Sequence, residues 1–249
     1  MLQKVILFLS FLFIPFSHVS VDTMGVPASD FPTPVSELAA GEQLFEEMEL
    51  GGIVNFIAFR QAVAGYNRIK EKSKPILTLI DFSKPSTEKR FFVFDMEKKQ
   101  LLYSSVVSHG RNSGENYATS FSNQNGSYKS SLGFYLTENT YQGGNGYSLI
   151  LNGLEKGIND KAKERSIVVH GASYANPTVA ASGRLGRSLG CPALPTKLAK
   201  PIINTIKDGS VMFIYANNSS YLAQSDILKN VSAPMPALET VFIRKSCTD

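Results

Sequence analysis

From Pro75 onward the chain is a succession of short apolar runs separated by polar loops, and this pattern constrains the fold more than any other feature. Each run is rich in β-branched and aromatic residues, as strands are. The Lys-rich EKKQ between the second and third runs predicts a hairpin turn, and only one later segment, near residues 196–207, predicts a helix. We therefore expect a mainly β domain over residues 75–217 with one inserted helix, rather than alternating βαβ units. The expected strands are 76–82, 90–95, 101–108, 132–137, 147–152, 166–171 and 210–217.

The residues before this domain predict an export signal followed by a short helical segment. Lys4 precedes an apolar run of twelve residues, VILFLSFLFIPF, and small and polar residues follow it. This run is shorter than the ~20 residues that cross a bilayer, so residues 1–25 predict a cleaved signal peptide rather than the alternative, a membrane anchor. Residues 26–74 predict two helices, and residues 218–249 a polar, Pro-rich tail. We expect an exported protein of the periplasm or cell envelope, with no transmembrane anchor in the mature chain.

Charge and residue counts disfavour two further classes of function. The net charge is +4, and the Lys and Arg residues are scattered, so we expect no nucleic-acid partner. Outside the signal peptide the chain has two His and two Cys, too dispersed for a zinc site. We expect no metal and no cofactor.

The stretch GRLGRSLGCPALP, residues 183–195, contains one of the two cysteines, Cys191. A cysteine nucleophile needs a neighbouring base, and His170 precedes it by 21 positions. Gly190 permits a tight turn in which the Gly190 and Cys191 N–H groups face a developing oxyanion. The alternative is a structural disulfide between Cys191 and Cys247.

Two histidines share the same local pattern. His109 and His170 each end an apolar run and each precede a glycine, which places both imidazoles at a strand end. His170 is the predicted base. His109 is expected either to line the cleft or to be structural.

At HGASYA and GRLGRSLGCPAL the sequence resembles the L,D-transpeptidase catalytic domain, whose motif is His-Gly, a gap, then Ser-x-Gly-Cys. SSLGFYLT and GLEKGIND match a divergent branch of this family, and the resemblance extends from about Ser36 to Ala216. It implies an L,D-transpeptidase-like β-sandwich or barrel. It also implies that Cys191 is the nucleophile, His170 the base, Gly171 the residue whose carbonyl orients the imidazole, and Ser188 a support beneath the turn.

Two positions depart from the family pattern. Leu189 stands where the family usually has His, and Pro192-Ala193 replaces a common Arg after the cysteine. We therefore expect Arg184 or Arg187 to bind the substrate carboxylate, the alternative being a salt bridge within the loop.

The resemblance implies a cysteine acyltransferase that cross-links peptidoglycan stem peptides through a thioester. With water as acceptor, the same acyl-enzyme would make it an L,D-carboxypeptidase. The competing class is a non-catalytic cell-wall binding module stapled by a disulfide. A wall-hydrolysing cysteine peptidase is disfavoured, because the common kind places Cys before His in the sequence.

Overall fold

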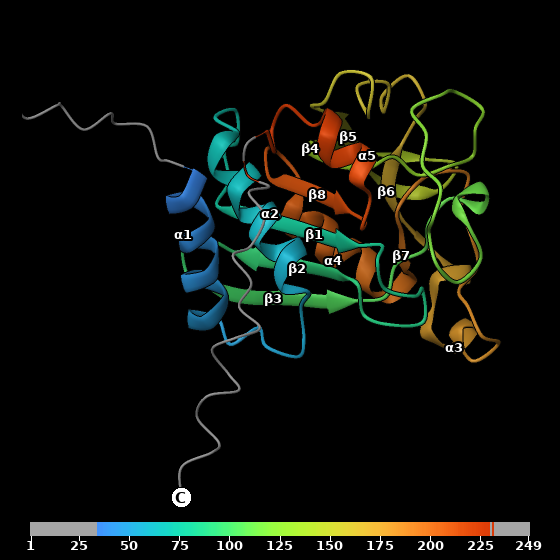
Figure 1. Ribbon diagram of the computed structural model, residues 1–249. Coiled ribbons are helices and arrows are strands. Elements are labelled where there is room, and N and C mark those ends of the chain that lie inside the picture. The colour runs from blue at the N-terminus through green and yellow to red at the C-terminus, as the bar shows by residue number, and fades with distance from the viewer. Residues whose placement is uncertain (1–33, 230, 232–249) are drawn as a thin grey trace, which may run out of the picture. The chain divides into compact units, whose positions relative to one another are not determined.

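The computed structural model describes residues 34–229 and residue 231, and its main feature is one eight-stranded mixed sheet (Figure 1). The strands are β1 (Ile76–Asp81), β2 (Phe91–Asp95), β3 (Gln100–Ser105), β4 (Gly133–Gly143), β5 (Gly146–Gly153), β6 (Val168–Ala172), β7 (Ala193–Pro195) and β8 (Val211–Tyr215). Their order across the sheet is β3-β2-β1-β8-β4-β5-β6-β7. The inserted helix is α4 (Thr196–Ile206). The predicted mainly β fold class is confirmed.

The two edges of the sheet are brought together by the chain that follows β3. Ser108 forms an antiparallel bridge with Ala193 of β7, and Gly110 forms a parallel bridge with Ser188. Since β3 and β7 are the edge strands, these bridges nearly close the sheet into a barrel. They also bring the segment around His109 next to the turn that carries Cys191.

Three neighbouring strands, β2, β1 and β8, are buried along their whole length, as their largely apolar sequences predict. β1 lies between β2, with which it is antiparallel, and β8, with which it is parallel. Phe134 of β4 stacks on Phe213 of β8 with ring centroids 4.1 Å apart. This rigid centre supports β6 and β7, which position the candidate site.

The N-terminal helical segment packs on the sheet and joins the same core. Helix α2 (Phe56–Arg68) lies against β1 and β8, and α1 (Pro34–Glu47) lies against α2. Asn55 caps α2, because its Oδ1 accepts hydrogen bonds from the amides of Ile57 and Ala58. The Phe59 and Val63 side chains of α2 are buried in this core.

The structure corrects several local expectations. The polar stretch YQGGNG, residues 141–146 between two of the expected strands, is the tip of the β4–β5 hairpin, where Gly143 pairs with Gly146. Strand β7 was not expected, and neither were the short helices η1 (Arg111–Ser113), η2 (Ser173–Ala175), α3 (Pro177–Ala180) and α5 (Ser219–Gln224). These elements are three to six residues long, too short for a periodic pattern to develop.

Two of the family-like motifs meet in the core at a buried carboxylate. Glu155 of GLEKGIND accepts a hydrogen bond from the amide of Phe134 in SSLGFYLT at 2.7 Å. Gly133 leaves room for this contact, since a Cβ there would lie 2.2 Å from Glu155 Oε2. Tyr221 and Ser225, within the predicted tail, also donate to Glu155.

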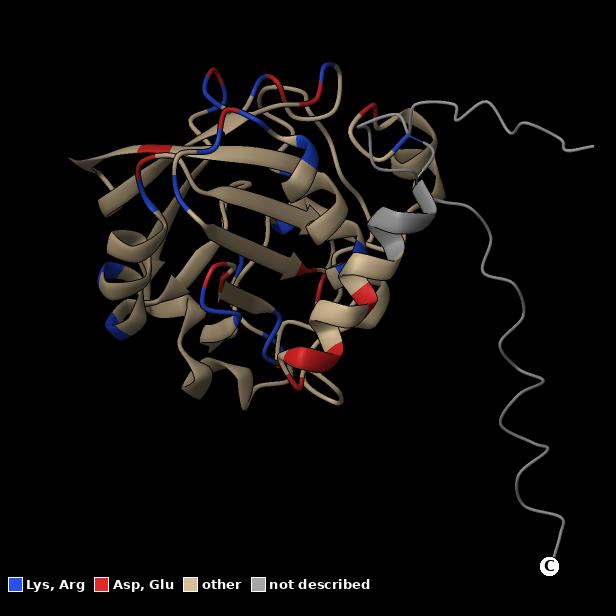
Figure 2. Cartoon of the chain, turned by 90° about the vertical axis from the view of Figure 1, so that its left-hand side faces the viewer, with Lys and Arg blue, Asp and Glu red and all other residues tan. Residues whose placement is uncertain are grey.

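The predicted signal peptide, Cys247 and the last strand-like segment lie outside the described residues. Over residues 34–229 and 231, no helix has the length and apolar character needed to span a membrane. Basic and acidic residues are scattered over loops and helices, as Figure 2 shows. The predicted domain boundaries remain predictions.

Candidate active site

Cys191 occupies a tight turn just before β7 and carries a free thiol. Gly190 adopts a φ of +132°, and a Cβ at this position would approach Ile167 Cδ1 to 2.9 Å and the Lys129 carbonyl to 3.1 Å. A glycine is therefore required here both by the backbone conformation and by the packing. The turn places the Cys191 side chain against the start of β6.

Ser188 closes the turn through two hydrogen bonds of its hydroxyl group. Its hydroxyl donates to the Cys191 carbonyl at 2.6 Å and accepts from the Gly190 amide at 3.0 Å. Its backbone is held by the segment after β3, because its amide donates to the His109 carbonyl and its carbonyl accepts from the Arg111 amide. The Gly190 amide, predicted to face the oxyanion, is thus bound inside the turn.

His170 lies on β6, directly opposite Ala193 in the parallel β6–β7 pair. The residue is 4% exposed, and its Nδ1 lies 3.1 Å from the carbonyl oxygen of Gly171. A carbonyl only accepts, so Nδ1 carries the proton and Nε2 has a free lone pair. Burial lowers the pKa of His170 below its ordinary value, so the ring is neutral at pH 7.

The Cys191 sulfur lies in hydrogen-bonding contact with the backbone that leads into β6. The Val168 amide donates to Sγ at 3.5 Å, and Sγ–H donates to the Ser166 carbonyl at 3.6 Å. Within the described part of the chain, no hydrogen bond joins Sγ to the His170 ring. Burial raises the pKa of Cys191, so the resting site pairs a neutral thiol with a neutral imidazole.

His109 is buried, and both of its ring nitrogens have hydrogen-bond partners, so it does not line a cleft. Arg90 Nη2 donates to Nδ1 at 2.8 Å, and Nε2 faces the Gly114 carbonyl at 3.3 Å. His109 is 1% exposed. Burial and then the Arg90 charge lower its pKa to about 4. Its side chain therefore anchors the segment whose backbone supports Ser188.

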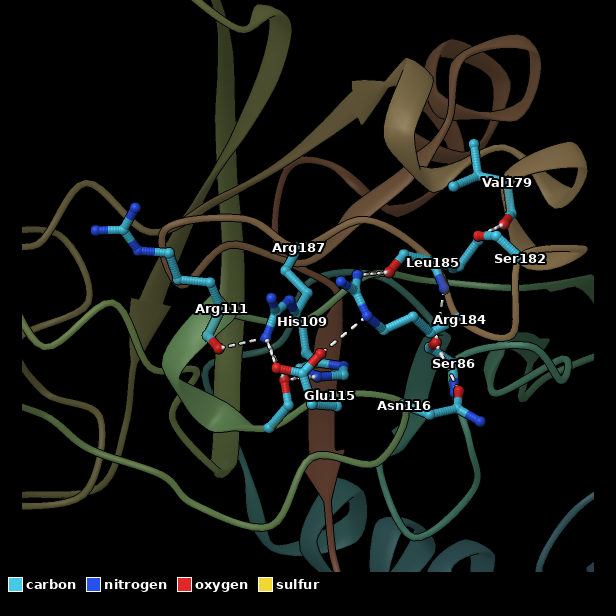
Figure 3. A network of polar contacts seen from close by, with 11 residues as sticks. Ser86, His109, Arg111, Glu115, Asn116, Val179, Ser182, Arg184, Leu185 and Arg187 are labelled. Carbon is cyan, nitrogen blue, oxygen red and sulfur yellow. Dashed lines mark hydrogen bonds and ion pairs between the residues drawn. The ribbon is translucent and has the colours of Figure 1, made fainter.

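Arg184 and Arg187 converge on one acidic residue in the loop outside the turn (Figure 3). Arg184 Nε lies 2.9 Å from one Glu115 oxygen, and Arg187 Nη1 lies 2.6 Å from the other. Arg187 also donates to the carbonyls of Arg111 and Gly114. In this structure both guanidinium groups form the loop salt bridge that was the alternative to substrate binding.

A comparison with known protein families identifies the family of this chain. The profile of the L,D-transpeptidase catalytic domain matches residues 52–215, which include both His170 and Cys191. The chain belongs to the L,D-transpeptidase catalytic domain family. The match begins before α2, in accordance with the packing of that helix into the core.

Solved L,D-transpeptidases resemble this chain weakly. An enzyme from Mycobacterium smegmatis has 13% identity and a TM-score of 0.35, covering 57% of this chain and 59% of its own. L,D-transpeptidase 3 from Mycobacterium tuberculosis has 14% identity and a TM-score of 0.36, covering 57% and 61%. One from Stackebrandtia nassauensis has 13% identity and a TM-score of 0.35, covering 74% and 80%. This chain thus spans about three fifths of the first two. No curated protein sequence matches it.

Three residues of this L,D-transpeptidase domain that were not predicted from the sequence lie around the turn. Ser130 donates to the Gly190 carbonyl at 3.0 Å. Arg165 lies close enough to Cys191 for its charge to lower the pKa of the thiol. Tyr174 lies near the same thiol, and burial raises its pKa to about 12. Ser130 belongs to SSLGFYLT and Tyr174 to HGASYA, so both motifs were usable signals, whereas Arg165 carries no pattern of its own.

Proposed function

We propose that the protein is an exported cysteine acyltransferase that forms L,D cross-links between peptidoglycan stem peptides, with Cys191 as nucleophile and His170 as base. The observation that carries the proposal is the β6–β7 pairing, which sets His170 on β6 opposite Ala193, two residues after the free thiol of Cys191 in the turn before β7. Family membership supports the reaction class. Export is proposed on the sequence of residues 1–25.

His170 is built to act as a base. The Gly171 carbonyl fixes the proton on Nδ1, so Nε2 is the atom that takes the thiol proton. The thiol must leave Ser166 and turn toward His170, since catalytic hydrogen bonds commonly form only when substrate is bound. Rotation about the Cα–Cβ bond of Cys191 supplies this motion.

The Cys191 amide is the proposed oxyanion donor. Ser130 binds the Gly190 carbonyl, and in a trans peptide the following N–H points in the opposite direction. This bond therefore fixes where the Cys191 N–H points. The Gly190 amide would join it only by releasing Ser188 Oγ.

The reaction then has two balanced steps. Sγ attacks the carbonyl of the diamino acid at the third stem position while its proton moves to His170 Nε2. The imidazolium returns that proton to the departing amine of the terminal D-residue, which leaves a thioester. An amine of a second stem attacks the thioester, transfers its proton through His170, and releases Cys191 with the cross-link formed.

The arginines remain proposed carboxylate ligands. For Arg184 or Arg187 to hold the stem carboxylate, that group must replace Glu115, which is 69% exposed and already occupies the position of an anionic ligand. After the exchange the two guanidinium groups would again be paired with a carboxylate, that of the stem peptide.

The test is turnover of a purified disaccharide-tetrapeptide followed by mass spectrometry. A cross-linked dimer and free D-amino acid support the proposal, and Cys191→Ala must abolish both. If only the shortened tripeptide forms, water is the acceptor and the enzyme is an L,D-carboxypeptidase. If no product forms and Cys191 does not react with thiol reagents, the cell-wall binding module becomes the better account.

A further inference from the structure

Arg165 stands three residues before β6 and is bound almost entirely by one loop. Nη1 donates to the Ser122 carbonyl at 2.8 Å and to Ser131 Oγ at 2.5 Å. Nη2 donates to the Lys129 carbonyl at 2.6 Å and to Ser127 Oγ at 3.3 Å. One half-buried guanidinium thus holds four points of the loop formed by residues 122–131.

This loop is in direct contact with the nucleophile turn. A Cβ on Gly190 would lie 3.1 Å from the Lys129 carbonyl and 3.5 Å from Arg165 Nη2. In the same loop, Ser130 donates to the Gly190 carbonyl and accepts from the Gly110 amide. Any shift of the loop would therefore move the peptide bond between Gly190 and Cys191.

The other charged or titratable groups around Cys191 are neutral or already bound. His170 is neutral at pH 7, and burial raises the pKa of Tyr174, so its phenol is neutral as well. The Lys129 ammonium donates to Ser120 Oγ, and both Arg184 and Arg187 pair with Glu115. Among the described residues, Arg165 is the cation whose charge lowers the pKa of the thiol, opposing the effect of burial.

We propose that Arg165 is a positioning residue of this site, which clamps the 122–131 loop against Gly190 and holds a fixed positive charge beside the turn that carries Cys191. The inference rests on the proposed function and deepens it. Four of its five N–H donors are bound to protein acceptors, so Arg165 acts on the thiolate and the turn, and does not bind the substrate carboxylate. In this chain it supplies a cation near the nucleophile where the residues that follow Cys191 supply none.

The test measures the rate of Cys191 alkylation by iodoacetamide as a function of pH, with product assigned by peptide mapping, and needs no substrate. Arg165→Met keeps an unbranched side chain but removes the charge. We expect the midpoint of the alkylation profile to rise by about half to one pH unit, which is about a three- to tenfold slower reaction below the midpoint. Lys163→Met is the matched control, since it removes a nearby cation that is paired with Glu138. Its midpoint should match that of the native protein.

A folded Arg165→Met protein with the native midpoint, or an equal shift in Lys163→Met, would overturn the proposal. If Arg165→Met does not fold, Arg165→Lys serves as the test variant. It keeps the positive charge but loses the planar hydrogen-bonding geometry of the guanidinium. We expect a midpoint near the native value with slower turnover of the tetrapeptide, and native turnover would overturn the clamp. Absence of Cys191 alkylation in the native protein would instead count against the proposed function itself.

Discussion

His109 and His170 have the same local sequence, an apolar run that ends in His-Gly, yet the structure gives them opposite protonation patterns. Nδ1 of His170 donates to the Gly171 carbonyl, and its Nε2 is left for a proton. Nδ1 of His109 must accept from Arg90, so its Nε2 carries the proton toward the Gly114 carbonyl. His170 therefore keeps a free lone pair with which it can act as a base, whereas both ring nitrogens of His109 are occupied and its ring braces the neighbouring segments.

The different roles of the two histidines are tested most strongly by removing each imidazole ring in turn. His170→Ala should lower acylation of Cys191 by about 10²–10⁴-fold, the range for general base catalysis, and nearly as completely as Cys191→Ala. His109→Ala should lower the rate less, because its side chain acts only through the segment that supports Ser188. Single-turnover acylation measures both. An inactive His109→Ala protein that is fully folded, beside an active His170→Ala protein, would reverse the assignment.

The second prediction concerns stability. The pKa of His109 is about 4 when folded against an ordinary value of 6.5, so between these values the unfolded chain binds a proton that the folded chain does not. Lowering the pH from 7 to 4 should therefore cost about 3 kcal/mol of unfolding free energy through this residue. His109→Asn, whose Oδ1 can accept from Arg90 in place of Nδ1, should lose this part of the pH dependence. Urea unfolding at several pH values measures it, and identical pH dependence in the two proteins would contradict the assignment.

The third prediction tests the arginines beside the His109 segment. Arg187→Lys or Arg184→Lys should raise the KM for a tetrapeptide stem, at a cost of about 1–3 kcal/mol in binding, because a lysine cannot form the paired hydrogen bonds of a guanidinium. Alkylation of Cys191 by a small reagent should not change. Glu115→Gln is the complementary variant and should lower KM by removing the competing carboxylate. If all three variants keep the native KM, the arginines are structural.

The smallest effect is on the acid limb of the pH–rate profile. Catalysis needs neutral His170, and activity is lost as pH falls through its pKa. Since burial lowers that pKa, kcat/KM should stay high to below pH 6.5 and then decline. Stopped-flow acylation across pH 4–8 measures the limb. A midpoint above pH 6.5 would show that another group, or a charged partner, controls the base.

The sequence predicted strands well where a run was long and apolar, as in β1 and β8, because burial and β-propensity agree there. It failed at β7, whose three residues pair only because Ser108 and His170 flank them. The histidine assignment shows the same limit. The His-Gly pattern places both rings at strand ends, but Arg90, which sets the tautomer of His109, is 19 residues distant and no spacing rule links them. Likewise Arg165 cannot be distinguished by sequence from Lys161 and Lys163, which lie within four residues of it.

The central claim, that Cys191 is the nucleophile activated by His170, is tested most directly by covalent capture. A thiolate next to an oxyanion donor should open the strained ring of a carbapenem, so incubation with imipenem followed by intact-mass and peptide-map analysis reports the reacting atom. We expect one drug-sized adduct on Cys191, none on Cys247, much slower formation in His170→Ala and none in Cys191→Ala. An adduct that forms on Cys247, or at the native rate in His170→Ala, would contradict it.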